Sequence, residues 1–204
     1  MDIKNNNETD RAVYRVLCGL SDKKPHMKRY YNSDKSGSID LAIFEDIPQG
    51  CSLTTVSTIG LYKTETGFSN NDRPLRAELA GICDSRDTES FCRALSAAAF
   101  EITDRPGCHP GAVIFNTVKN NYPPCNMKHF LLDSASSSDI WYEKITKNDD
   151  VIIDGRQIVW LTPIPISHEE YLYMVKHGND YNTLIEIFHR NDVDIADVYR
   201  KSVV

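Results

Sequence analysis

The sequence of 204 residues lacks long apolar runs: no window approaches the roughly 18 uninterrupted apolar residues of a membrane-spanning helix. It also lacks an export signal, because its first ten residues are polar and acidic where such a signal has a basic flank followed by an apolar stretch. We therefore expect a protein of the cytoplasm that is neither exported nor embedded in a membrane.

Motifs of the common enzyme classes are absent as well. There is no Gly-x-Ser-x-Gly elbow for a nucleophilic serine, and neither glycine-rich form of a phosphate-binding loop occurs. His168 opens the segment His-Glu-Glu, but a zinc-protease helix needs a second histidine four residues later, where Leu172 stands. The sequence indicates no catalytic residue, no metal ligand and no cofactor, and we expect that the protein is not an enzyme.

Cysteine is present six times but never as a Cys-x-x-Cys pair, which argues against a zinc ribbon or a thioredoxin-like redox centre. A chain this long does not need disulfides to build its core, so we expect reduced cysteines that act as small buried apolar residues. Two thiol–imidazole pairs stay open as alternatives, Cys108 with His109 and Cys125 with His129. Either would make the protein an enzyme with an unrecognised active site.

The composition is that of an ordinary globular chain, with 41% hydrophobic and 25% charged residues. The net charge of −6 argues against direct nucleic-acid binding, which requires a basic surface, and favours a basic protein partner. The negative charge is concentrated between residues 167 and 197, where only Lys176 and Arg190 are basic. The acidic residues of this segment are Glu169, Glu170, Asp180, Glu186, Asp192, Asp194 and Asp197.

The spacing of apolar residues predicts a mixture of helices and strands. Apolar residues at helical spacing predict helices over about 7–20 and 87–102. Period-two alternation and β-branched residues predict strands over 24–31, 39–44, 52–62, 75–83, 112–116, 128–132, 140–145, 151–153 and 157–164. The last two are joined by Asp154-Gly155, a strong hairpin signal. Glu78 lies in a predicted strand, as either an exposed residue at its rim or a buried polar anchor.

The period changes to helical at Ser167, where Ser-His-Glu-Glu matches a capping box: the Ser167 side chain caps the third amide and Glu170 reaches back. A helix is predicted from there to about residue 177, with Tyr171, Leu172, Met174 and Val175 packing inward. A second helix starts at 180 or 182, and Asp194 caps one more short turn. We expect an α+β fold with a mixed, mostly antiparallel sheet flanked by helices, in one domain spanning 1–204, whose helical C-terminal part covers about 167–200.

The order of these segments resembles the suppressor-of-fused domain family, including its stand-alone bacterial members. The resemblance is carried in order by six segments: Thr-Val-Ser-Thr-Ile-Gly-Leu (55–61), Leu-Arg-Ala-Glu-Leu (75–79), His-Pro-Gly (109–111), Phe-Leu-Leu (130–132), Ile-Val-Trp-Leu-Thr-Pro-Ile-Pro-Ile-Ser-His-Glu-Glu-Tyr-Leu (158–172) and Asp-Ile-Ala-Asp-Val-Tyr-Arg-Lys-Ser (194–202). Together they span about Ser52 to Ser202, most of the chain.

The resemblance implies a suppressor-of-fused-like fold that holds a protein partner without catalysis. The larger animal relatives sequester a transcription factor by clamping an extended peptide, whereas stand-alone bacterial members are associated with polymorphic toxin systems as immunity proteins. The animal proteins carry a further C-terminal region that this chain lacks, so none of their peptide-clamping residues is carried over to it.

Two functions from different classes follow. The first is an immunity protein, or antitoxin, that neutralises a cognate toxin such as a nuclease; an acidic surface suits a basic toxin because opposite charge speeds encounter. The second is a peptide-binding scaffold that sequesters a regulatory protein through an open sheet edge. Charge and exposure alone suggest the partner-binding residues Glu169, Glu170, Asp192, Asp194 and Asp197. The oligomeric state stays open.

Overall fold

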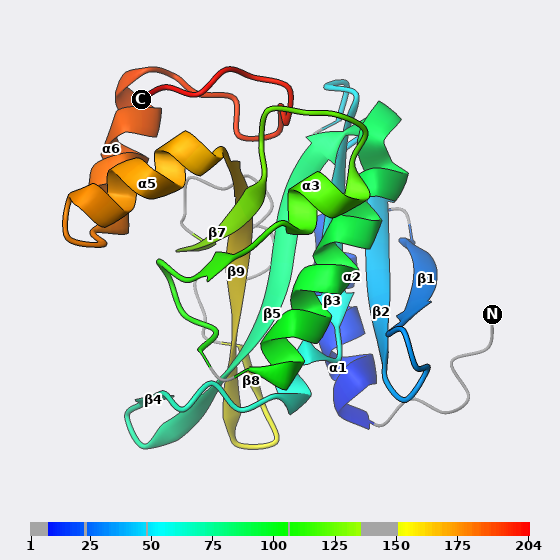
Figure 1. Cartoon of the computed structure of the whole chain (residues 1–204). Helices are drawn as coiled ribbons and strands as arrows, with labels where there is room; N and C mark the ends of the chain where they lie inside the picture. The colour runs from blue at the N-terminus through cyan, green and yellow to red at the C-terminus, as the bar shows by residue number, and fades with distance from the viewer. Residues whose placement is uncertain (1–7, 23, 48, 106, 136–150) are drawn as a thin grey trace.

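The computed structural model describes residues 8–22, 24–47, 49–105, 107–135 and 151–204. Within these ranges, a nine-stranded sheet runs in the order β1-β2-β3-β5-β9-β7-β6, with β4 added to β5 and β8 added to β9. Helix α2 covers one face of the sheet, helix α1 packs behind it, and α5 and α6 stand beside β7 and β9 (Figure 1). This is the mixed α+β fold that the sequence predicts.

The N-terminal half follows the predicted order. Its elements are α1 (Glu8–Leu17), the 3-10 turn η1 (Cys18–Leu20), β1 (His26–Tyr31), β2 (Ser38–Glu45), β3 (Leu53–Ile59), the 3-10 turn η2 (Leu61–Lys63), β4 (Ser69–Asn70) and β5 (Arg73–Asp84). Strands β1, β2, β3 and β5 pair antiparallel in turn.

The alternation in β2 explains how one strand serves two cores. Its odd-numbered Ile39, Leu41 and Ile43 belong to the cluster beneath α2. Its even-numbered Ala42 and Phe44 belong to the cluster around α1. Because successive side chains of a strand point to opposite faces, an apolar run that is buried on both sides places the sheet between two layers of helix.

The C-terminal half departs from prediction in two places. Its elements are the 3-10 turn η3 (Ser85–Asp87), α2 (Thr88–Asp104), β6 (Val113–Ile114), α3 (Thr117–Asn121), β7 (His129–Ser134), β8 (Val151–Ile153), β9 (Arg156–Ile166), α5 (His168–Lys176) and α6 (Tyr181–Arg190). The strand expected over 112–116 is shorter because Asn116 adopts a left-handed φ of 60°, and the unpredicted α3 follows directly. The strand expected over 140–145 lies outside the described residues.

Strand β9 joins the two halves of the sheet. It pairs parallel with β5, with Ala77 opposite Val159, and antiparallel with β7, with Leu131 opposite Ile164. Strand β9 pairs with β5 only as far as Leu161, and Pro163 and Pro165 lie beyond that point. The backbone N–H that each proline lacks is therefore not needed for pairing with β5. The predicted hairpin that leads into β9 is confirmed by positive φ angles at Asp154 and Gly155.

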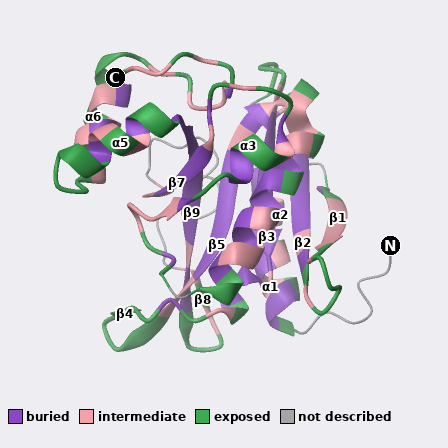
Figure 2. Ribbon diagram, in the orientation of Figure 1, coloured by how far each residue is buried: buried purple, intermediate pink, exposed green. Residues whose placement is uncertain are grey.

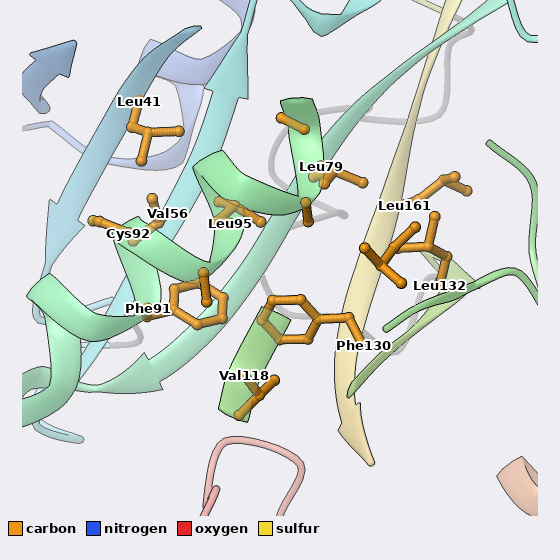
Figure 3. Packing of buried hydrophobic residues seen from close by; sticks show 14 of the residues in the cluster. Leu41, Val56, Leu79, Phe91, Cys92, Leu95, Val118, Phe130, Leu132 and Leu161 are labelled. Carbon is orange, nitrogen blue, oxygen red and sulfur yellow. The ribbon is translucent and has the colours of Figure 1, made fainter. Parts of the chain in front are cut away.

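Three apolar clusters hold these layers together, and the buried residues follow the central strands and the inner side of α2 (Figure 2). Beneath α2, Phe91 meets Phe130 of β7 edge to face, with ring centroids 6.1 Å apart (Figure 3). A third cluster joins Met174 of α5 and Phe188 of α6 to β7 and β9. The C-terminal helices are therefore fixed to the sheet. None of the helices in the described ranges has the length and apolar composition needed to cross a bilayer.

Candidate protein-binding surface

The C-terminal helices begin where the sequence predicts. The Ser167 hydroxyl accepts a hydrogen bond from the amide of Glu170 at 3.0 Å, and the amide of Ser167 donates to the Glu170 carboxylate at 2.9 Å. This reciprocal pair is the predicted capping box, and it starts α5 directly after β9. Asp180 likewise caps α6 by accepting from the amide of Asn182.

Glu170 does not belong to the molecular surface. Its side chain is fully buried, and Arg200, itself 8% exposed, donates to its carboxylate at 2.6 and 3.1 Å. The amide of Val203 donates to the same carboxylate at 3.2 Å. The expectation that Glu170 contacts a partner is therefore corrected: the capping box turns its side chain inward, and the C-terminal tail covers it.

Arg200 anchors the tail, residues 191–204, across the end of the sheet. Its guanidinium also donates to the carbonyl of Pro165 at 2.9 Å and lies 4.9 Å from the centre of the Phe188 ring. Further along, the Asn126 side chain donates to the carbonyls of Tyr199 and Arg200. The position of the tail, and of every carboxylate on it, thus depends on contacts with β9, α6 and the segment before β7.

Two of the predicted site residues lie on this tail, close to two carboxylates from another part of the chain. Asp194 and Asp197 line a surface pocket of about 240 Å³ together with Asp84, the last residue of β5, and Asp87, in the 3-10 turn η3. We call these four residues the acidic pocket. The tail carboxylates also shape it, since Asp194 accepts from the amide of Ala196 and Asp197 from the amide of Tyr199.

Arg86 lines the same surface pocket as the four carboxylates. Its side chain donates to Asp84 at 2.7 and 3.0 Å, and these hydrogen bonds lower the pKa of Asp84 to about 2. Asp87 accepts a long hydrogen bond of 3.4 Å from the Tyr199 hydroxyl. Four carboxylates against one guanidinium leave this part of the surface negative. The sequence has no spacing that could have joined Asp84 and Asp87 to residues more than 100 positions later.

The remaining two candidates lie apart from the pocket. Glu169 is exposed in the first turn of α5, where its own amide and the Ser167 hydroxyl lower the pKa of its carboxyl. Asp192 is exposed in the turn after α6, with a left-handed φ of 50°. Neither lines the acidic pocket. Of the five predicted residues, Asp194 and Asp197 are the two that lie together in the acidic pocket.

A histidine pair lies at the start of α5. His129 of β7 is buried, and its Nδ1 accepts from the amide of Asn116 at 3.0 Å. The ring therefore carries its proton on Nε2, which lies 3.2 Å from Nδ1 of His168 and donates to it. Burial first, and then the neighbouring charges of His168, Lys119 and Lys128, lower the pKa of His129 to about 4.

This pKa predicts an acid-dependent loss of stability. Between pH 6.5 and 4 this histidine binds a proton in the unfolded chain but not in the folded chain. The free energy of unfolding therefore falls as the pH falls. We expect the variant His129→Asn to be less stable than the wild type at pH 7 and to recover about 1–2 kcal/mol relative to it at pH 5. Urea unfolding at both values measures the difference. His189→Asn, at an exposed histidine of α6, is the control, and equal pH slopes for His129→Asn and wild type would contradict the assignment.

The two thiol–imidazole pairs left open by the sequence do not form. Cys108 is buried beneath α2, which raises the pKa of its thiol to about 12, while His109 is exposed against the ring of Phe68. Cys125 donates to the carbonyl of Met127 at 3.2 Å, and His129 bonds instead to Asn116 and His168. Within the ranges that the structure describes, no three His, Cys, Asp or Glu side chains are arranged so that they could hold a metal ion.

Comparisons with known proteins agree with this architecture. A family model described as Suppressor of fused protein (SUFU) matches residues 35–201. Over 198 residues, 97% of this chain and 98% of the relative, the sequence is 28% identical to Immunity protein YqcF of Bacillus subtilis (strain 168).

Solved structures show the same fold at low sequence identity. A chain of the Sufu-Fu complex crystal structure aligns with a TM-score of 0.61 at 9% identity, covering 96% of this chain and 92% of that one. The crystal structure of Drosophila Suppressor of Fused aligns with a TM-score of 0.62 at 10% identity, over 100% of this chain and 54% of its own. The present chain thus spans about half the length of the Drosophila protein.

Proposed function

This chain belongs to the suppressor of fused family, and from that premise we propose that it is an immunity protein, a non-catalytic protein of the cytoplasm that neutralises a cognate toxin by binding it. The observation that carries the proposal is its similarity, over nearly its whole length, to a relative that bears the name immunity protein.

The toxin that suits this surface is a basic protein, and nucleases are one such class. The chain has a net charge of −6, and the acidic pocket gathers carboxylates from two distant segments. Opposite charge accelerates the encounter of two proteins and orients them before contact. We propose that Asp84, Asp87, Asp194 and Asp197 receive basic side chains of the toxin, with Glu169 and Asp192 contributing longer-range attraction.

Co-expression tests the proposed function directly. The protein to test as the toxin is the product of the neighbouring gene, produced alone or together with this chain in the same cells. Cells that make both proteins should survive and cells that make the toxin domain alone should die. Death in both cases, with both proteins present at comparable levels, would refute neutralisation of that toxin.

Removing charge from the tail should slow association with this toxin. The double variant Asp194→Asn/Asp197→Asn keeps the side-chain oxygens that accept from Ala196 and Tyr199, so its turns stay intact. We expect the association rate at low salt to fall about three- to tenfold, and the gap to narrow as salt screens the charges. Stopped-flow kinetics at two salt concentrations measures both effects.

The matched control for this experiment is Glu186→Gln, which removes an exposed carboxylate from α6, outside the acidic pocket. It should leave the association rate within a factor of two of the wild type. A tail variant that associates as fast as the wild type at every salt concentration would show that the acidic pocket does not steer the toxin.

The second candidate function, a peptide-binding scaffold, has one supporting observation. Strand β1 lies at the edge of the described sheet, with β2 as its neighbour, and an extended peptide could pair with its free side. The edge is short and carries Lys28 and Arg29, and charged residues commonly protect an edge from pairing. A short linear peptide that binds as tightly as the folded partner would favour this function over the first.

A further inference from the structure

Helix α5 exposes apolar side chains where a surface helix is expected to be polar. Leu172 is 51% exposed and Val175 is 40% exposed. The sequence predicted that both pack inward, and the structure shows this to be wrong. Each residue turns about 100° around a helix, so once Glu170 and Met174 face the sheet, Leu172 must point away from it and Val175 lies near the outer side.

The neighbouring helix shows that this exposure is particular to α5. Helix α6 buries Leu184 and Phe188 and turns Glu186, His189 and Arg190 to the solvent, as an amphipathic surface helix should. Both helices pack against the same strands through the same apolar cluster. The apolar outer side of α5 is therefore not a consequence of its place in the fold.

The apolar surface continues from α5 onto the turn that follows β6. The ring of Tyr171 meets that of Phe115 edge to face, with centroids 4.9 Å apart, and Phe115 is 42% exposed. We call Phe115, Tyr171, Leu172 and Val175 the α5 face. Grouped exposed apolar side chains are the usual mark of a protein–protein interface, whereas single ones are ordinary.

Charges of opposite sign border this face at the two ends of the helix. Glu169, Leu172 and Lys176 are spaced i, i+3 and i+7, which places them in one row along α5. Glu169 and Lys176 are both exposed, and neither forms an ion pair within the described part of the chain. They lie about 10 Å apart along the helix axis.

We propose that the α5 face binds a second copy of this chain, with the two α5 helices antiparallel across a two-fold axis near Leu172. In this arrangement Glu169 of each copy meets Lys176 of the other, and Leu172 and Val175 pack in the middle. The contact is self-complementary in charge and apolar character, as a two-fold interface requires. Antiparallel helices also bring opposite dipole ends together.

The surrounding charges favour a second copy over a basic toxin at this position. Lys119 and Lys128 lie close enough to the histidine pair to affect the pKa of His129, and Lys176 borders the face itself. A basic protein would meet like charge here, whereas it would meet carboxylates at the acidic pocket. The inference therefore does not depend on the acidic pocket, and of the residues proposed to attract the toxin only Glu169 belongs to both surfaces.

Sedimentation of the purified full chain tests the proposal. Between about 5 and 500 µM the wild type should shift from the mass of one chain toward the mass of two. Leu172→Arg should weaken this association at least tenfold, because it places two like charges at the centre of the contact. Glu186→Lys, a charge reversal on the outer side of α6, should leave it unchanged.

A charge swap separates the proposed geometry from simple loss of apolar surface. Glu169→Lys and Lys176→Glu should each weaken the dimer several-fold, because each creates two like-charge contacts across the axis. The double variant Glu169→Lys/Lys176→Glu restores both opposite-charge contacts and should return the dimer to near wild-type strength. Circular dichroism and thermal melting confirm that each variant is folded.

The proposal is overturned by a wild type that stays monomeric over the whole range, by a dimer that tolerates Leu172→Arg, or by a double variant that fails to restore association. Loss of toxin neutralisation by Leu172→Arg, with a monomeric wild type, would instead assign the α5 face to the toxin. Failure of the dimer alone leaves the proposed immunity function intact, because the acidic pocket is tested by separate variants.

Discussion

Replacing Arg200 with alanine should lower the free energy of unfolding by about 3–5 kcal/mol, the usual cost of leaving a buried charge without its partner. Arg200 is the cation that faces the fully buried carboxylate of Glu170, and it holds that carboxylate through two hydrogen bonds. Thermal melting should register the loss as a fall of roughly 10 °C in a chain of this length.

Two companion variants identify the cause of this loss. Lys201→Ala, at the exposed neighbour of Arg200, should change stability by less than about 0.5 kcal/mol. In a cycle with Glu170→Gln, the double variant Glu170→Gln/Arg200→Ala should lose less than the sum of the two single changes, since each removes the same contact. A loss below about 1 kcal/mol for Arg200→Ala would mean that the pair does not hold the tail.

The same variant connects stability to the proposed function. The tail carries Asp194 and Asp197 to the acidic pocket, and Arg200 fixes the tail between Pro165 and Phe188. A tail released at Arg200 separates these carboxylates from Asp84 and Asp87. At a temperature where Arg200→Ala is still folded, we therefore expect its association with the toxin to be slower than that of the wild type.

Local chemistry explains which parts of the fold were predictable from the sequence. The capping box at Ser167 and Glu170, the Asp154-Gly155 hairpin and the alternation in β2 each depend on residues within four positions of one another. These features were predicted and are confirmed. The parallel pairing of β5 with β9 joins residues about 80 positions apart, and no local pattern encodes it.

The candidate site was harder to predict because charge is visible in a sequence and burial is not. Glu169 and Glu170 are adjacent and chemically alike, yet one is exposed and the other is covered by Arg200, which lies thirty residues later. The inward packing predicted for Leu172 failed similarly, since it depended on which side of α5 faces the sheet. Both errors concern the orientation of a correctly predicted helix.

Glu78 shows the same limit in the middle of the sheet. The sequence allowed either an exposed or a buried side chain, and the structure buries it completely. Its carboxylate accepts from the Thr58 hydroxyl and from the amides of Gly60 at 2.8 Å and Tyr62 at 3.3 Å. It thereby holds the sharp turn after β3, where Gly60 adopts a φ of 114°.

Burial has the larger effect on this carboxyl group. Removal from water disfavours the ionised form and raises the pKa of Glu78 to about 7, although the hydrogen bonds from Thr58, Gly60 and Tyr62 act in the opposite direction. Between pH 4.5 and 7 the folded chain therefore holds a proton that the unfolded chain releases. Through this group, stability decreases as pH rises over that interval.

The variant Glu78→Gln removes this titration while keeping an oxygen that can accept from Gly60 and Tyr62. From pH 5 to pH 8 we expect its stability relative to the wild type to rise by about 2–3 kcal/mol. Urea unfolding across the range measures the change, and Glu45→Gln, at an exposed carboxyl near the end of β2, should show no such rise. A flat difference would mean that the hydrogen bonds keep Glu78 ionised throughout.

Glu78 and His129 should act in opposite directions over nearly the same interval. As pH falls from 7 to 5, Glu78 adds stability while His129 removes it. The free energy of unfolding of the wild type should therefore vary less with pH than that of either variant. Glu78→Gln should lose stability in acid, because His129 then acts unopposed, and His129→Asn should gain it. If both variants instead move in the same direction relative to the wild type, one of the two assigned protonation states is wrong.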